Sequence, residues 1–166
     1  MIEIDYPPLI NPASIILGKL RDVYNAEMNE EAAHFKRGER SEHVNVLGVK
    51  GELIAQYFLF TRRSLYTATK LLAQKPLAEP DITVGDKKFD VKAIRTDAPD
   101  LLVNAVAHAK AKGITDYWFV QCFDGNRARF WFYTHAEVSE WPQKDCKYSM
   151  AHYRTIKDIK KDKTDE

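Results

Sequence analysis

A change of hydrophobic period near residue 80 constrains the fold of this chain more than any other feature. Before it, apolar residues recur at the spacing of helices; after it, they alternate with polar residues on both sides of Gly85 and Asp86. A two-residue turn at that point would join two antiparallel strands. The apolar positions of this hairpin are Ile82, Val84, Phe89, Val91 and Ile94. Helices that alternate with strands in this way predict an α/β fold.

The predicted order is helix, helix, strand, strand, helix, strand, strand and a short last helix. Helices are expected near residues 15–24, with Asn11 or Ser14 as cap, and near 44–60, 101–109 and 135–141. Strands are expected in the hairpin 82–94 and at 117–123 and 127–133. We therefore expect one domain over residues 1–156, with a mixed central sheet flanked by helices. Its core would span about 44–133, and the charged tail 157–166 would fray.

Composition narrows the class of protein. The chain has 166 residues, of which 45% are hydrophobic and 30% charged, which suits a domain that folds alone. It has no apolar run long enough to span a membrane and no secretory leader, so a cytoplasmic location is expected. Its two cysteines and five histidines are scattered without zinc-site spacing, so any metal should be held by oxygen. With a net charge of +1, nucleic-acid binding would need locally clustered Lys and Arg.

The predicted hairpin directs two carboxylates to one face. With a two-residue turn at Gly85, Asp81 lies opposite Asp90, and Lys92 projects from the same face two residues farther along. Directly paired side chains are about 4.5 to 5.5 Å apart at Cβ, where like charges are destabilising without a cation. A four-residue loop would pair Asp81 with Lys92 on the same face, whereas a three-residue loop with a bulge could break the arrangement.

Glu52 offers a third acid from the second predicted helix. Its neighbours on the helix surface are small or apolar, so it is a candidate buried acid. Gly48 and Gly51 each cost the helix on the order of 1 kcal/mol, which a close approach of another backbone would explain. Alternatively, one of these glycines marks the start of the helix.

These residues resemble a known family. Pro80-Asp81, eight intervening residues and Asp90-Val91-Lys92, preceded by a helical glutamate, are similar to the PD-(D/E)XK nuclease superfamily, which includes restriction endonucleases and Holliday-junction resolvases. The resemblance covers residues 46–133 and extends to the order of elements. It implies a restriction-endonuclease-like core and a Mg²⁺-dependent (or Mn²⁺-dependent) endonuclease that hydrolyses phosphodiester bonds of DNA. A homodimer would suit the cutting of both strands.

The resemblance also implies a role for each residue. Asp81, Asp90 and the main-chain carbonyl of Val91 would bind the metal, and Glu52 would be either a further metal ligand or an acid that positions water. Lys92 would orient or help activate the attacking water. Gln121, on the strand after the third helix, would be a further contact in the site.

Other interpretations stay open. In the plainest one, Asp81 is a turn residue, Asp90 and Lys92 form an exposed strand edge, and Glu52 is a solvated charge. A non-catalytic nucleic-acid-binding or assembly domain could also retain the fold.

Several polar and aromatic groups have their own alternatives. Asn104 and His108 either contact substrate or form the wet face of a helix. The aromatic residues Trp118, Trp131, Trp141, Phe130 and Phe132 are assigned to packing. The basic residues Lys36, Arg37, Arg40, Arg62 and Arg63 would contact phosphates or serve only solvation.

Overall fold

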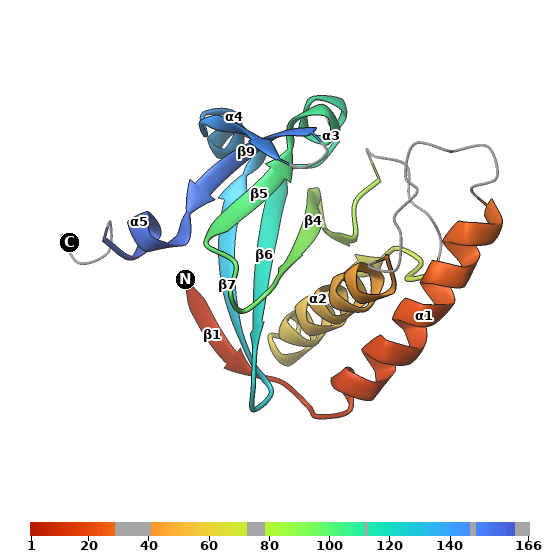
Figure 1. The fold of residues 1–166 in the computed structure, drawn as a ribbon. Helices are drawn as coiled ribbons and strands as arrows, with labels where there is room; N and C mark the ends of the chain where they lie inside the picture. The colour runs from red at the N-terminus through yellow and green to blue at the C-terminus, as the bar shows by residue number, and fades with distance from the viewer. Residues whose placement is uncertain (29–40, 73–78, 112, 147–148, 162–166) are drawn as a thin grey trace.

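The computed structural model describes residues 1–28, 41–72, 79–111, 113–146 and 149–161, and it has the expected α/β fold (Figure 1). The helices are α1 (Ile10–Met28), α2 (Ser41–Thr61), α3 (Ala105–Lys110), α4 (His135–Ser139) and α5 (Ile156–Lys161). The strands are β1 (Ile2–Asp5), β2 (Thr67–Ala68), β3 (Ile82–Val84), β4 (Lys87–Ile94), β5 (Asp100–Asn104), β6 (Asp116–Phe123), β7 (Arg127–Thr134), β8 (Gln143–Cys146) and β9 (Ser149–Thr155). No helix within the described ranges is long and apolar enough to cross a membrane.

The central sheet is mixed, as expected. Its order is β1-β7-β6-β4-β3-β2, with β4 and β6 parallel and the other neighbours antiparallel. The predicted hairpin is confirmed, because Val84 pairs with Lys87 across a two-residue turn. Gly85, the first turn residue, has φ of +59°, which glycine adopts without steric strain.

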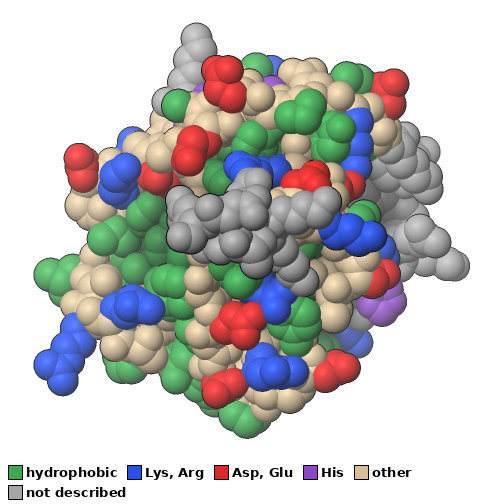
Figure 2. Space-filling view, turned by 90° about the vertical axis from the view of Figure 1, so that its left-hand side faces the viewer, with side chains coloured by type: hydrophobic (Ala, Val, Ile, Leu, Met, Phe, Trp, Pro, Cys, Tyr) green, Lys and Arg blue, Asp and Glu red, His purple; other side chains and the backbone are tan. Residues whose placement is uncertain are grey.

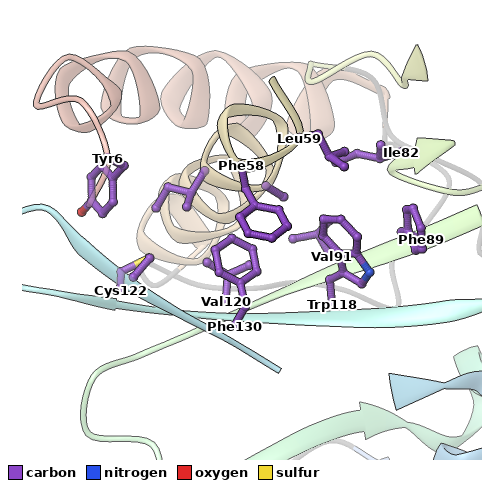
Figure 3. Packing of buried hydrophobic residues seen from close by; sticks show 13 residues of the cluster. Tyr6, Phe58, Leu59, Ile82, Phe89, Val91, Trp118, Val120, Cys122 and Phe130 are labelled. Atoms are coloured by element: carbon purple, nitrogen blue, oxygen red, sulfur yellow. The ribbon is translucent and has the colours of Figure 1, made fainter. Parts of the chain in front are cut away.

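Helix α2 covers one face of the sheet, and α1 lies outside α2 (Figure 1). Figure 3 shows Phe58 and Leu59 of α2 packed over Val91, Trp118 and Phe130 of the strands. Side chains of β4 alternate, so Phe89 and Val91 face α2, whereas Asp90 and Lys92 project to the other face. That other face carries a second core, which buries residues from β5, β6, β7, α4 and α5.

Helix α1 differs from the prediction. It begins at Ile10, so the proposed caps Asn11 and Ser14 lie inside its first turns. Its apolar stripe faces outward: Ile16, Leu20 and Val23 are 60%, 49% and 55% exposed. The opposite side of the helix, which carries Gly18 and Arg21, packs on α2 instead.

The second sheet was not expected. It has the order β5-β9-β8, and β5 occupies residues predicted as helix. Burial there alternates with a period of two, with Leu101 and Val103 buried and Leu102 exposed, so apolar spacing alone misassigned the segment. The helix that follows is α3, capped by the Asn104 side chain, which accepts from the Ala107 N–H.

The C-terminal segment also differs. Residues up to Lys161 form α5 rather than a frayed tail, because Ile156 and Ile159 are buried in the second core. Residues 162–166 lie outside the described residues.

Of the remaining predictions, one was wrong, one is confirmed and others concern residues outside the described ranges. His108 is buried, so its assignment to a wet helix face was wrong. The packing assignment of the aromatic residues is confirmed: the three tryptophans and Phe130 are buried, and Phe132 packs against Trp118 and Phe130. Arg62 stacks over the Phe58 ring at 4.3 Å. Lys36, Arg37 and Arg40 lie outside the described residues.

Candidate active site

The expected site residues of the hairpin meet where β3 stops pairing with β4. The last pair of the ladder is Ile82 with Phe89, and in the described part of the chain β4 continues beyond it beside β6 alone. Asp81 then leaves the ladder: its N–H donates to the Phe89 carbonyl at 2.9 Å, and its Oδ2 accepts from the Val91 N–H at 2.6 Å. The Asp81 carboxylate thus satisfies a backbone donor that another strand would otherwise pair.

Lys92 and Asp90 form a close ion pair at this point. The Lys92 Nζ donates to both carboxylate oxygens of Asp90 at 2.7 Å, and the two side chains are 34% and 20% exposed. Burial raises the pKa of Asp90, and the Asp81 charge adds to that effect, whereas the Lys92 ammonium opposes it. Asp81 and Asp90 therefore both interact with the Lys92 ammonium, as expected if the three side chains share one face of the hairpin.

Lys92 remains a cation in these surroundings. Burial alone would lower its pKa, but the carboxylates of Asp90, Asp81 and Glu52 outweigh that effect and raise it. The coupling also brings the helical acid Glu52 into the electrostatic surroundings of the hairpin residues. Lys92 is thus influenced by all three predicted acids, which lie on α2 (Glu52), just before β3 (Asp81) and on β4 (Asp90).

Glu52 has a partner that the sequence did not reveal. The guanidinium of Arg21, on α1, holds both carboxylate oxygens of Glu52, with NH1–Oε1 at 2.9 Å and NH2–Oε2 at 3.0 Å. The Arg21 Nε also donates to the Leu71 carbonyl. Both side chains are largely buried, which confirms that Glu52 is a buried acid. The sequence feature that could have indicated this partner is the position of Arg21 on the same side of α1 as Ser14 and Gly18, which are buried.

Two glycines bring these elements together. A Cβ at Gly18 of α1 would lie 2.5 Å from the Val46 Cα on α2, and one at Gly51 of α2 would lie 2.7 Å from the Ala93 Cβ on β4. Only glycine permits either approach without a shift of the backbone. Among the described residues, a Cβ at Gly48 would meet only the Arg21 guanidinium, at 3.6 Å. The close approach expected of the helical glycines is therefore made by Gly51, which sits beside Glu52.

Gln121 occupies a different place from the other predicted site residues. It is buried, and its register partner on β4 is Ile94. Its Nε2 donates to the carbonyls of Arg95 and Thr96 at 3.2 and 3.0 Å. Gln121 thus fixes the loop that follows β4, and a contact with substrate stays a prediction.

The carboxylates of Asp81 and Asp90 are the kind of oxygen ligand that Mg²⁺ prefers, but Asp81 accepts from the Val91 N–H and Asp90 from the Lys92 ammonium. In the portion of the chain that the structure describes, no three His, Cys, Asp or Glu side chains are grouped to hold a metal ion. Since the N–H and C=O of a strand residue point to the same neighbour, the Val91 carbonyl faces the side that Asp81 occupies. Two carboxylates and this carbonyl fit Mg²⁺, which keeps several waters, provided that Lys92 releases one Asp90 oxygen.

One face of the molecule, the left-hand side of Figure 1, is mixed in charge. Figure 2 shows Lys and Arg side chains among Asp and Glu on it, with hydrophobic side chains between them. Two hollows of about 380 and 350 Å³ share Lys50 and Asp124 in their linings, and neither is lined by Asp81, Asp90 or Lys92. The carboxylates of Asp81 and Asp90 thus line neither of these hollows.

No protein-family model, curated protein or solved structure matches this chain. The function is therefore argued from the geometry of the site.

Proposed function

We propose that this protein is a Mg²⁺-dependent nuclease of the PD-(D/E)XK type that hydrolyses phosphodiester bonds, with DNA as its substrate. The observation that carries the proposal is the Lys92 ammonium, 2.7 Å from both oxygens of Asp90, on a strand in which the intervening Val91 N–H donates to the Asp81 carboxylate. Two acids and a cation, one acid just before β3 and the other two groups on β4, are the arrangement that the resemblance requires. A homodimer and a cytoplasmic location stay predictions.

In the proposed reaction, Asp81, Asp90 and the Val91 carbonyl would hold the metal ion. Bound there, Mg²⁺ would supply positive charge to the phosphate and lower the pKa of water. Water attacks phosphorus and gives up one proton to solvent, the bond from phosphorus to the leaving oxygen breaks, and that oxygen takes a proton from solvent. The chain's own contribution is to place the acids and Lys92 around the scissile phosphate in advance.

The surroundings of Lys92 favour one of its two expected roles. Because nearby carboxylates raise its pKa, Lys92 keeps its proton near neutral pH. A protonated amine cannot accept a proton from water, so it acts as a hydrogen-bond donor. We infer that Lys92 orients the attacking water or a phosphate oxygen and adds a positive charge beside it.

One observation favours the alternative of a non-catalytic nucleic-acid-binding domain. Lys92 spans both oxygens of Asp90, and Arg21 spans both of Glu52, so two of the three predicted acidic ligands are already neutralised by side chains. Such a protein would bind DNA without cutting it.

The test is incubation with supercoiled, linear, branched and single-stranded DNA in Mg²⁺ or Mn²⁺. We expect cleavage by the wild-type protein and a loss of about 10²-fold or more in Asp90→Asn. Asp86→Asn, which removes an exposed acid of the same hairpin, is the matched control and should cut normally. DNA binding without cleavage by the wild-type protein would support the alternative instead.

A further inference from the structure

Helix α1 exposes its apolar stripe instead of burying it. Of the described helices and strands, α2 is the one on which α1 packs, and none covers the outer side of α1 (Figure 1). The side turned toward α2 carries Ser14, Gly18 and Arg21. A surface helix ordinarily turns its apolar stripe to the core. The packing of a single copy therefore does not explain why this stripe is apolar.

The stripe has the spacing of a seam between two helices. Its members follow one another at steps of four, three, four and three residues, and they are Leu9, Ala13, Ile16, Leu20 and Val23. Leu9 is the residue immediately before α1, and the other four lie within the helix. Apolar side chains at this alternating spacing on one helix fit between those of a second helix. The stripe is thus suited to a helical partner.

The charges of α1 lie away from the stripe. In residues 9–24, Arg21 and Asp22 form hydrogen bonds with side chains of α2, and Lys19 lies at the edge of the stripe. Nucleic acid would require cations on the binding face. A helix that lies in a membrane surface has a polar side rich in Lys and Arg, whereas the corresponding side of α1 is buried against α2. An apolar protein surface is the partner that fits.

The exposed apolar area is close to what a dimer needs. Leu9, Ile16, Leu20, Val23 and the adjoining Tyr24 are 75%, 60%, 49%, 55% and 36% exposed. Together they expose roughly 450 Å², whereas the largest apolar patch of a typical monomer is about 300 to 600 Å² and is often functional. Since about 60% of an interface is apolar, this patch corresponds to roughly 750 Å² from each partner, against about 800 Å² in interfaces of standard size.

We propose that the apolar stripe of α1 is the surface through which two copies of this chain form a homodimer. A second copy presents the same stripe at the same spacing, so a two-fold axis can pack each stripe on its counterpart. From the area we expect a dissociation constant of about 1 to 100 µM. Urea titrations performed below this range report the single copy, in which the stripe is exposed.

The test is sedimentation velocity of the full chain between about 1 and 300 µM, without DNA or metal, so that its outcome is independent of the proposed function. We expect the wild type to change from the mass of one copy to that of two. Ile16→Glu and Leu20→Glu should each raise the dissociation constant about 100-fold or more, because a two-fold interface contains every substitution twice. Leu65→Glu is the matched control: Leu65 is 92% exposed between α2 and β2, and this variant should dimerise as the wild type does.

Mixtures of oppositely charged variants test whether two copies meet at the stripe. Leu20→Glu, Leu20→Lys and Ile16→Lys should each be monomeric alone. Dimers should return when Leu20→Glu is mixed with Leu20→Lys if the helices are parallel, or with Ile16→Lys if they are antiparallel. Circular dichroism shows whether each variant is folded, and Ile16→Gln and Leu20→Gln take the place of a variant that is not.

Several results would overturn the proposal. A wild type that keeps the mass of one copy at about 300 µM would do so. Dimers that persist in both stripe variants, or that are lost equally in Leu65→Glu, would show that the stripe is not the interface. A monomeric wild type that binds phosphatidylcholine vesicles, combined with loss of that binding in Leu20→Glu, would assign the stripe to a lipid surface instead.

Discussion

Acidification should destabilise this protein through His108, whose surroundings the structure defines in detail. His108 Nδ1 lies 2.9 Å from the Tyr117 hydroxyl, and its Nε2 lies 2.9 Å from the Ser139 hydroxyl. Its ring stacks on His135 at a centroid distance of 3.9 Å and meets His152 edge-on at 4.8 Å. The imidazole is therefore enclosed by two other histidines, a phenol and a hydroxyl, from α4, β6 and β9.

Hydrogen bonding selects the neutral form of this ring. The Ser139 hydroxyl donates its single proton to the His135 carbonyl at 2.9 Å, so toward His108 it acts as an acceptor. His108 Nε2 therefore carries the ring proton, and Nδ1 accepts from Tyr117. Burial raises the pKa of Tyr117, and the charge of its register partner Asp90 adds to this, so the phenol keeps its proton. A second proton on His108 would leave two donors facing each other.

The size of the effect follows from the pKa. Burial first, and then the charges of His135 and His152, lower the pKa of His108 from 6.5 to about 4. In this range the unfolded chain binds more protons than the folded one, so the free energy of unfolding falls as pH falls below about 6.5. The shift corresponds to a loss of about 2 kcal/mol between pH 7 and pH 5, and of about 3 kcal/mol in total once the pH is below 4.

Urea unfolding at pH 5, 6 and 7 measures this dependence. His108→Gln removes the titration, so its free energy of unfolding should change between pH 7 and pH 5 by about 2 kcal/mol less than that of the wild type. His43→Gln, at an exposed position on α2, is the matched control and should keep the wild-type pH dependence. Equal pH dependence in the wild type and His108→Gln would refute the buried, neutral imidazole.

Three further perturbations test the packing and the site. Gly51→Ala should lower the free energy of unfolding by about 1 to 3 kcal/mol in urea titrations, because its Cβ would overlap β4, whereas Gly48→Ala should be tolerated or stabilising. Leu20→Gln should change stability by less than about 0.5 kcal/mol if the stripe of α1 is exposed, against about 2 to 5 kcal/mol for the buried Ile54→Ala. Asp90→Asn should keep or raise the Tm measured without metal, since the pKa of this acid is raised by the fold, and Mn²⁺ should raise the Tm of the wild type but not of this variant.

Short-range signals made the hairpin and its acids predictable. Gly85 in a two-residue turn sets the register, and the register then determines which strand residues share a face with Asp90. The prediction differed from the structure in detail at Asp81. Its carboxylate accepts from the Val91 N–H beyond the end of β3, a contact that depends on where the ladder stops.

Arg21 and the orientation of α1 could not be predicted from apolar spacing. The helix has an apolar stripe, but the approach of Gly18 to Val46 fixes its rotation and turns that stripe outward. Such an approach depends on the shape of a neighbouring helix, which no local pattern records.

The second sheet could not be predicted either, because its strands pair across a long distance in the sequence. Leu101 fits either a helix or a strand, and the choice is made by β9, about fifty residues later in the chain.

The most direct measurement of the central claim is the single-turnover rate of supercoiled-DNA cleavage in Mg²⁺ by the wild type and by Lys92→Met. If the Lys92 ammonium beside Asp90 belongs to a phosphodiester-hydrolysing centre, the wild type nicks or linearises the plasmid and the variant is slower by about 10²-fold or more. Equal rates in the two proteins, or a wild type that leaves the plasmid intact, would contradict it.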